Sequence, residues 1–282
     1  MIQILIIGGA GFIGSNLCKE LSKNNSLQLT SLDNYFTGDV KNHHKNIRYI
    51  NGHTKDIFDL INFKPSIIIH LGEYSRVEQS FKERDIVFES NYFGTKQVIE
   101  FAVHNNSKLV YGASSTIFAS ESKNLSPYSF TKSTNVDLIK AYSKWYGLNF
   151  SIVYFYNVYG GNEIRHGQYA TLIGIFTNQY INNENLTVVK PGSQMRNFTH
   201  INDVVSGLIL VIKNIKNNEF HLGNDKKYSV LDIAKMFKGN IIFLPEREGN
   251  RSDSNIDNSD LRKLGWKPSV EIIDYINKII LL

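Results

Sequence analysis

Short apolar runs alternate with longer amphipathic segments through the first half of the chain. Apolar runs of four to eight residues bounded by turn residues are typical of buried strands, whereas apolar positions three and four apart are typical of helices. The alternation predicts strands at 2–7, 27–32, 66–71, 108–113 and 149–154, and helices at 12–24, 83–105 and 127–146. Strands that alternate with helices in this way favour a parallel sheet covered on both faces.

The pattern becomes less regular after about residue 155. Loop-like stretches such as "GGNEIRHGQY" and "NNEN" separate shorter helices, which we expect near 169–181, 201–214, 229–237 and 270–281. We therefore predict an α/β protein with a Rossmann-type, doubly wound parallel sheet and a smaller C-terminal substrate-binding lobe. The NAD-binding domain is expected to comprise residues 1–156 and about 196–219, and the lobe residues 157–195 and 220–282.

Composition limits the class of protein. The chain has 282 residues, of which 42% are hydrophobic, so it can bury a sizeable core. Its apolar runs are far shorter than the roughly 18 residues that a membrane span needs, so we expect no membrane segment. The sequence opens without the pattern of a signal peptide, and a single cysteine, Cys18, excludes an internal disulfide. These features predict a cytoplasmic protein.

An excess of basic residues raises the question of nucleic-acid binding. Lys and Arg number 31 against 26 Asp and Glu, which gives a formal net charge of +5. The densest basic segment, 39–56 ("DVKNHHKNIRYINGHTKD"), also holds aspartates and no nucleic-acid motif, so we interpret it as a solvated surface loop. Its histidines lack the spacing of metal ligands, so we predict no metal site. The charge is compatible with an anionic small-molecule substrate.

A glycine-rich turn joins the first strand to the first helix. The segment "IQILIIGGAGFIGSNLCKEL" places Gly8, Gly9, Gly11 and Gly14 where a backbone without Cβ atoms turns tightly and approaches a pyrophosphate. Asp33 ends the second strand 19 residues after Gly14, where a carboxylate accepts hydrogen bonds from ribose hydroxyls. Because this carboxylate would repel a 2′-phosphate, the pattern favours NAD over NADP.

The stretch "SPYSFTK" at 126–132 places a tyrosine and a lysine on one helix face. Ser126 is a suitable N-cap and Pro127 a suitable first residue, so Tyr128 and Lys132 lie one turn apart. A phenol that works as a base near pH 7 needs a pKa lowered by roughly 3 units, which is about 4 kcal/mol. An ammonium at ~4 Å contributes about 4 kcal/mol at an effective dielectric constant of 20. A solvated surface pair is the simpler alternative.

A serine-bearing strand favours the functional interpretation over that alternative. The segment "KLVYGASS" delivers Ser114 and Ser115 to the carboxyl end of a predicted strand, the edge where such sheets bind their ligands. A hydroxyl at this position can share the proton that moves between a substrate and a phenolate. Ser114, Tyr128 and Lys132 are therefore the candidate catalytic residues.

A series of short motifs runs along the chain in a fixed order. They are "GGAGFIG", "LDNYFTG", "HLGEYSRVEQS", "NYFGT", "SSTIF", "YSFTK", "YFYNVYG", "RNFTHINDV" and "LGWKP". Together they resemble the extended short-chain dehydrogenase/reductase family, and within it the NAD-dependent nucleotide-sugar epimerases and dehydratases. The resemblance implies oxidation at C4 of the sugar. We expect 4-epimerisation of a UDP-hexose, of the UDP-glucose or UDP-galactose type, through a 4-keto intermediate.

The resemblance also implies roles for residues at matching positions. Tyr128 looks like the general base, Lys132 its partner and Ser114 the assisting hydroxyl. Positions that match cofactor contacts are Gly8, Gly11, Phe12, Ile13, Asp33, Asn34, His53, Thr54, Leu71, Asn91, Tyr128, Lys132 and Tyr156. Positions that match substrate contacts are Arg76, Thr116, Asn157, Arg196 and Arg251. A homodimer formed through helices 83–105 and 127–146 is a further implication.

Departures from the family pattern leave alternatives open. Dehydratases of the family use an Asp-Glu pair directly after the serine or threonine, where this chain has Ser115 and Thr116, which disfavours dehydration. Glu73 and Arg76 replace small residues near the expected nicotinamide and sugar, either as a rim salt bridge or with Arg76 binding a phosphate or carboxylate. A decarboxylase, a dehydrogenase or reductase and a dehydratase are alternatives among 4-oxidising enzymes. Among proteins that are not enzymes, the alternative is a non-catalytic NAD-binding sensor.

Overall fold

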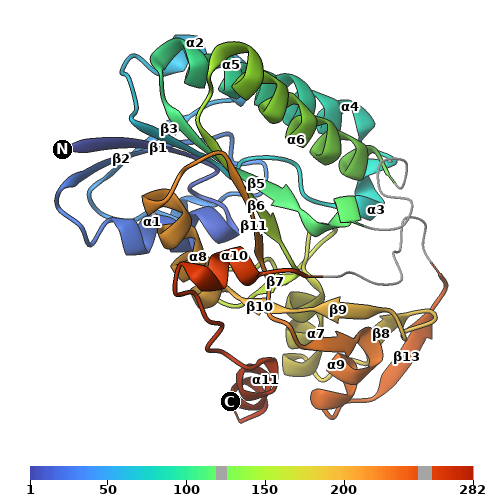
Figure 1. Cartoon of the computed structure of the whole chain (residues 1–282). Helices are drawn as coiled ribbons and strands as arrows, with labels where there is room; N and C mark the ends of the chain where they lie inside the picture. Colours follow the sequence, from blue (N-terminus) through green and yellow to red (C-terminus); the bar gives the residue numbers. More distant parts are fainter. Residues whose placement is uncertain (119–125, 247–255, 282) are drawn as a thin grey trace.

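The centre of the molecule is a parallel sheet of seven strands. A computed structural model describes residues 1–118, 126–246 and 256–281. The strand order is β11-β6-β5-β4-β1-β2-β3, and every neighbouring pair is parallel (Figure 1). The strands are β1 (Ile2–Ile7), β2 (Leu27–Asp33), β3 (Ile47–Asn51), β4 (Ile67–His70), β5 (Lys108–Ser114), β6 (Phe150–Phe155) and β11 (Asn218–Leu222). The order grows outward in both directions from β1 and β4, which confirms the predicted doubly wound, Rossmann-type fold.

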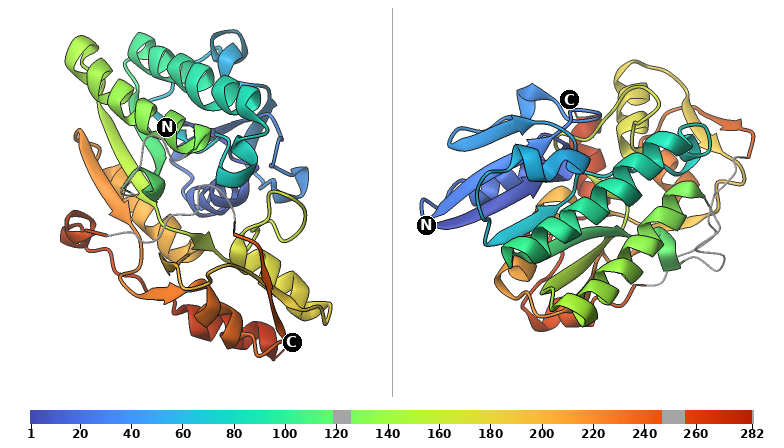
Figure 2. Two further views of the ribbon diagram at one scale, coloured as in Figure 1. Left: turned by 90° about the vertical axis from the view of Figure 1, so that its right-hand side faces the viewer. Right: turned by 90° about the horizontal axis from the view of Figure 1, so that it is seen from above.

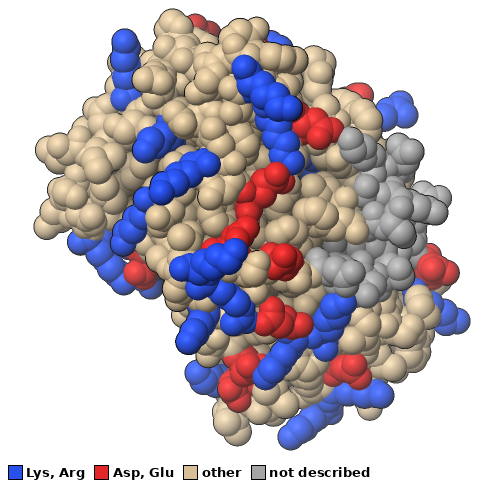
Figure 3. Space-filling model, in the orientation of Figure 1, with Lys and Arg blue, Asp and Glu red and all other residues tan. Residues whose placement is uncertain are grey.

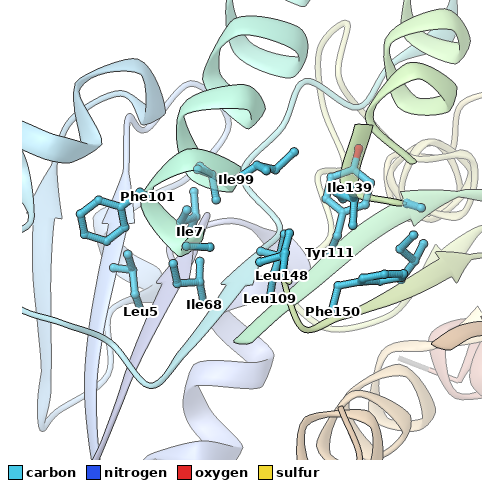
Figure 4. Packing of buried hydrophobic residues seen from close by; sticks show 14 of the residues in the cluster. Leu5, Ile7, Ile68, Ile99, Phe101, Leu109, Tyr111, Ile139, Leu148 and Phe150 are labelled. Carbon is cyan, nitrogen blue, oxygen red and sulfur yellow. The ribbon is translucent and has the colours of Figure 1, made fainter. Parts of the chain in front are cut away.

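Alternate residues of each central strand enter two separate hydrophobic layers. Leu5 and Ile7 of β1 pack under the helices on one face (Figure 4), whereas Ile4 and Ile6 pack under those on the other. Figure 2 shows the ribbon from two further sides, with helices on both faces of the sheet. The covering helices are α5 (Thr95–Asn105) and α6 (Pro127–Tyr146) on the first face, and α1 (Phe12–Leu21) and α8 (Ile201–Lys213) on the second. Because both faces are covered, the central strands are almost continuously apolar. Their apolar runs therefore predicted them as strands.

The segment predicted as one helix at 83–105 is helical throughout but changes its winding. It consists of α4 (Arg84–Val87), the π-helix η3 (Phe88–Gly94) and α5 (Thr95–Asn105). Shorter helices connect the strands: α2 (Ile57–Leu60), α3 (Val77–Ser80), and the 3₁₀ turns η1 (Val40–Asn42), η2 (Thr54–Asp56) and η4 (Ser115–Phe118).

A smaller lobe lies at the carboxyl edge of the sheet (Figure 1). Its strands pair in twos: β7 (Val158–Tyr159) with β10 (Thr199–His200), β8 (Leu186–Val189) with β13 (Ile241–Leu244), and β9 (Met195–Asn197) with β12 (Lys227–Ser229). Its helices are α7 (Leu172–Ile181), α9 (Val230–Met236) and α11 (Ile272–Ile280). A third hydrophobic cluster, which includes Phe176, Phe237 and Ile276, forms the core of this lobe.

Two edge strands correct the predicted organisation. The segment 39–56 is not simply a loop, because β3 at Ile47–Asn51 pairs with β2. The boundary placed between residues 219 and 220 cuts through β11, which pairs with β6 in the main sheet. Helix α10 (Ser259–Lys263) then packs Leu261 into the layer beside α8, so part of the predicted lobe also belongs to the sheet domain. Both edge strands are partly exposed, and their polar residues hide the strand pattern.

Candidate active site

A cavity of about 640 Å³ opens at the carboxyl edge of the sheet, against the lobe. It lies within the size range of small-molecule sites. The structure brings most of the predicted site residues to its wall: Gly8, Gly11, Phe12, Ile13, Asp33, Asn34, His53, Leu71, Arg76, Ser114, Thr116, Tyr128, Lys132 and Asn157. Thr54 lines a small adjoining pocket together with Asp33 and His53. From the lobe, Ile164, Thr171 and Phe198 also line the cavity.

The glycine turn at the end of β1 is packed too closely to admit side chains at Gly8 and Gly14. Gly8 has a φ of +83°, and a Cβ atom there would lie 2.7 Å from the Gly72 backbone. A Cβ at Gly14 would lie 2.0 Å from the Gly8 carbonyl oxygen, so the first turn of α1 packs directly on the turn. This close packing and the open N-terminus of α1 match what a pyrophosphate group requires.

Asp33 at the end of β2 is fixed beside this turn. Its two carboxylate oxygens accept hydrogen bonds from the Ala10 and Tyr35 backbone N–H groups, each at 2.8 Å. Burial raises the pKa of Asp33 above its ordinary value, and these hydrogen bonds oppose the increase. Each carboxylate oxygen has a further lone pair, so Asp33 can accept from ribose hydroxyls, and the residues at this end of the cavity fit NAD.

Helix α6 carries Tyr128 and Lys132 into the cavity wall rather than into solvent. Ser126 caps the helix, because its Oγ accepts from the Ser129 backbone N–H at 3.1 Å, and Pro127 is the first helical residue. Tyr128 is 7% exposed and Lys132 is 6% exposed, which excludes the solvated surface pair. Lys132 Nζ donates to the Gly112 carbonyl oxygen at 2.6 Å, which anchors it to β5.

Ser114 ends β5 at the same wall. Its Oγ accepts from the Thr116 backbone N–H at 3.3 Å and from Thr116 Oγ1 at 3.0 Å. Because either hydroxyl of the Ser114–Thr116 pair can be the donor, the Ser114 O–H can point to Thr116 Oγ1 or to a ligand in the cavity.

Glu73 also lines the cavity, and the sequence did not reveal which side chains surround it. Its side chain is 2% exposed and forms an ion pair with Lys132, so the predicted rim salt bridge with Arg76 is wrong. Its carboxylate also accepts from Thr95 Oγ1 at 2.7 Å, Asn135 Nδ2 at 2.8 Å and Tyr111 Oη at 3.1 Å. The spacing of Asn135, three residues after Lys132 on the same helix face, was the one local signal for this network.

Arg76 donates to neutral oxygen atoms instead of to a carboxylate. Its Nε donates to the Tyr169 carbonyl oxygen at 2.8 Å, and Nη2 donates to the same oxygen. Its Nη1 donates to the carbonyl and hydroxyl oxygens of Ser75 at 2.9 and 3.1 Å. Among residues 1–118, 126–246 and 256–281, Arg76 has no carboxylate within salt-bridge distance.

Four predicted contact residues do not lie in the cavity wall or cannot be placed. Asn91 is fully buried and exchanges hydrogen bonds with the Tyr74 backbone, at 2.7 and 3.1 Å, so it shapes the loop after β4. Tyr156 is also fully buried, and its Oη is 2.6 Å from His221 Nδ1. Arg196 is 8% exposed on β9 and is absent from the lining. Arg251 lies outside the described residues.

Two further features of the described residues concern binding: the surface charges on one face and the potential metal ligands. Basic and acidic side chains are interspersed on the face shown in Figure 3. No group of three or more His, Cys, Asp or Glu residues that could hold a metal ion occurs in the described ranges. A helix long and apolar enough to cross a membrane is likewise not found within them.

Comparisons with known proteins agree with this arrangement. The model of the NAD dependent epimerase/dehydratase family matches residues 4–223. A Methanocaldococcus jannaschii protein provisionally named UDP-glucose 4-epimerase is 30% identical over 299 residues, which cover 99% of this chain and 97% of that protein. UDP-glucuronic acid decarboxylase 1 of Danio rerio is 26% identical, covering 99% and 72% respectively. The crystal structure of Thermotoga maritima UDP-glucose 4-epimerase with UDP-glucose has a TM-score of 0.91 at 24% identity, covering 99% of this chain and 98% of that chain. The chain therefore belongs to the NAD-dependent epimerase/dehydratase family.

Proposed function

We propose that this protein is a nucleotide-sugar 4-epimerase that acts on a UDP-hexose through a transient 4-keto sugar. The observation that carries the proposal is a single cavity whose wall holds the glycine turn and Asp33 as well as Ser114, Tyr128 and Lys132. A dinucleotide and a sugar can therefore meet in it. The 30% identity to the Methanocaldococcus jannaschii protein over almost its whole length supports the same reaction.

The side chains at the catalytic end of the cavity supply proton transfer. Tyr128, as the phenolate, removes the proton from the C4 hydroxyl of the sugar, and later returns it. The hydroxyl of Ser114 donates to the oxygen on which charge develops. Bound NAD would supply the hydride acceptor for C4 and the source of the returning hydride. Lys132 uses two of its three N–H donors on Glu73 and Gly112, which leaves one for the ribose beside Tyr128.

The other end of the cavity would bind and orient NAD. Gly8, Gly11 and Asp33 would hold the pyrophosphate and the adenosine ribose, and His53 would lie beside the adenine. Burial lowers the pKa of His53, so its ring is neutral near pH 7. For epimerisation, the keto sugar must present its other face to the same residues, so the nucleotide diphosphate has to be gripped and the sugar left free to turn. Asn157 is the predicted diphosphate residue that lines the cavity.

A second candidate is the oxidative decarboxylation of a UDP-hexuronic acid. It is favoured by Arg76, a guanidinium in the cavity wall that has no carboxylate partner in the described residues, and by the UDP-glucuronic acid decarboxylase among the relatives. A carboxylate at C6 of the substrate would form an ion pair with the guanidinium of Arg76. Dehydration is less well supported, because Ser115 and Thr116 offer no carboxylate and Glu73 is already paired with Lys132.

Product analysis distinguishes these reactions. The purified protein is incubated with UDP-, GDP- and CDP-hexoses and with UDP-hexuronic acids, and the products are identified by NMR. Interconversion of C4 epimers without added NAD is the expected result. Release of carbon dioxide would instead establish the decarboxylase, and stoichiometric consumption of added NAD a dehydrogenase. Bound NAD with no conversion of any sugar would overturn the enzymatic proposal and favour a sensor.

We also propose that the protein is a homodimer. Large apolar side chains are exposed on η3 and α6, two helices that contact each other: Phe93 is 57% exposed, Phe130 42% and Trp145 65%. An exposed apolar surface of this kind is typical of a protein–protein contact. A second copy of the chain, which offers the same surface, fits a twofold interface.

A further inference from the structure

We propose that three aromatic side chains, Phe36, Tyr74 and Tyr169, form a bridge that encloses bound NAD, and that Glu83 is a positioning residue that keeps this aromatic bridge closed. None of the four is among the positions expected to contact NAD or the sugar. The inference deepens the proposed function, since it rests on NAD lying between the glycine turn and Asp33. A closed bridge would keep the same cofactor in place for both hydride transfers of one epimerisation.

The strand order brings two of the rings together across the glycine turn. β1 lies between β2 and β4, so the loops that follow β2 and β4 flank the turn at the end of β1 on its two sides. Strands two places apart in a sheet are separated by roughly 10 Å. Phe36 follows β2 and Tyr74 follows β4, yet their ring centroids are only 5.8 Å apart, and both residues line the cavity. A pyrophosphate bound at the turn would therefore lie in a space that these two side chains span.

The lobe supplies the third ring. Tyr169 lies in the loop before α7, and its ring centroid is 5.1 Å from that of Phe36 and 6.2 Å from that of Tyr74. The three ring pairs are tilted or edge-to-face, at separations within the range of roughly 4.5–7 Å that favours aromatic contacts. Arg76 fixes the backbone of this loop, because its Nε donates to the Tyr169 carbonyl oxygen at 2.8 Å. The bridge thus joins the lobe to two loops of the sheet domain.

Glu83, directly before α4, holds two of the rings in place. Its carboxylate accepts from Tyr74 Oη at 2.6 Å and from Tyr169 Oη at 2.7 and 2.9 Å, and Gln168 Nε2 donates to it at 3.2 Å. One carboxylate therefore binds hydroxyl groups from both parts of the molecule, and hydrogen bonds to an ionised acceptor are stronger than those between neutral groups. Neither Glu83 nor Tyr169 belongs to the cavity lining. Both therefore act by closing the bridge and not by touching the cofactor.

A closed bridge is a barrier to cofactor movement in both directions. A cofactor has to wait for the bridge to open before it enters and before it leaves, so a weakened bridge raises the association and dissociation rate constants together and leaves Kd nearly unchanged. Side chains that only contact the bound cofactor behave differently, because their loss raises the dissociation rate constant and Kd. Tyr169→Phe is the decisive variant, since it removes the hydrogen bonds to Glu83, keeps the ring and leaves the cavity lining intact.

The test follows the fluorescence of NADH on protein stripped of its bound cofactor. Rapid mixing gives the association rate constant, and displacement of bound NADH by excess NAD gives the dissociation rate constant. Both are expected to rise about tenfold or more in Tyr169→Phe and in Glu83→Ala, because a hydrogen bond to a charged acceptor has that value. Phe36→Ala removes two of the three ring contacts and should act in the same direction, whereas Phe36→Tyr keeps the ring and should retain the wild-type rates.

Two matched variants control for the loss of a hydroxyl and of a ring elsewhere. Tyr142→Phe removes a hydroxyl that donates to Glu100, and Phe58→Ala removes a 44% exposed ring that contacts Phe101 and His104. Tyr142 and Phe58 lie outside the cavity lining, so both rate constants are expected to stay at their wild-type values.

The outcomes separate this inference from the proposed function, because the rates are measured without a sugar. Unchanged rate constants in Tyr169→Phe, or a rise in the dissociation rate constant alone, would overturn the bridge even if sugars are converted. A joint rise would support it even if no nucleotide sugar turns over, a result that would overturn the proposed function alone. A wild-type protein that binds no NADH would overturn both. Should Glu83→Ala fail to fold, Tyr169→Phe, which removes a single oxygen atom, still decides the question.

Discussion

At the scale of single residues, Tyr128→Phe separates chemistry from binding. The substitution removes one hydroxyl from a buried ring that keeps its packing against Tyr74 and Val87. We expect kcat to fall by about 10²–10⁴-fold, the usual contribution of a general base, while bound NAD is retained. C4-epimer conversion and NAD content measure the two effects. Tyr142→Phe on the same helix removes a hydroxyl that donates to Glu100 outside the cavity wall, and it is expected to keep full activity. Unchanged turnover in Tyr128→Phe would contradict the assigned base.

Asp33 should make NAD binding sensitive to acid. The ionised carboxylate accepts hydrogen bonds from the ribose hydroxyls, and protonation takes away part of that capacity. Because burial raises the pKa of Asp33, affinity is lost as the pH falls through a value above the ordinary one for aspartate. Calorimetric titration with NAD of protein stripped of its bound cofactor, at a series of pH values between 4 and 7, checks this. Asp33→Asn should bind NAD more weakly at neutral pH and show a flatter pH profile, whereas an equally steep profile would assign the effect to another group.

The sequence indicated where Glu73 lies but not which side chains it contacts. The motif "HLGEYSRVEQS" placed Glu73 and Arg76 near the cavity, and two charges of opposite sign three residues apart suggested a mutual salt bridge. The structure sends the two side chains in different directions, because Glu73 meets donors from α5, α6 and β5. Contacts between elements distant in sequence decide such pairing. Tyr128, Lys132 and Ser114 were predictable, since a helix turn and a strand end fix their directions.

At the scale of elements, the packing of α1 against β1 depends on the absence of a side chain at Gly14. A methyl group there would lie 2.0 Å from the Gly8 carbonyl oxygen, which is backbone and cannot rotate away. Gly14→Ala should therefore destabilise the protein by about 1–3 kcal/mol and weaken NAD binding, because the turn has to shift. Thermal unfolding and NAD titration measure both losses. At Gly161 a Cβ would meet nothing within 4 Å, so Gly161→Ala is the control. Equal stability of the two variants would refute the packing argument.

Strands with two buried faces could be predicted from the sequence, whereas strands at the edge of a sheet could not. The strands β1, β4 and β5 are apolar because helices cover both sides, and α6 was predicted with its observed ends because Ser126 and Pro127 mark its start. β11, with the sequence "NEFHL", buries Phe220 and Leu222 but only half-buries its polar positions, so its pattern is weak. Strands of two or three residues in the lobe, such as β7 and β10, are too short to carry any periodicity.

At the scale of the whole molecule, the lobe and the sheet domain are joined around the cavity rather than by one linker. Asn16 of α1 donates to the Gly161 carbonyl oxygen at 2.9 Å, and Asn162 donates to Ser15 Oγ at 3.2 Å. On the other side of the opening, Arg76 donates to Tyr169. The chain also crosses between the two parts several times, because α8, β11 and α10 of the sheet domain alternate along the sequence with lobe elements. Contiguous sequence segments therefore could not describe the two parts.

The proposed dimer is tested by placing charge on its apolar surface. The wild-type protein should sediment at twice the 32.2 kDa of one chain. Phe93→Asp combined with Phe130→Asp puts two carboxylates into the contact, where each would lose its hydration without gaining a partner, so the protein should sediment as a monomer. NAD content should be retained, because a single chain supplies the cavity wall. Phe243→Asp, at a 48% exposed position on β13, is the matched control and should leave the dimer intact. A monomeric wild type, or a double variant that remains dimeric, would show that the exposed apolar surface of η3 and α6 serves another purpose.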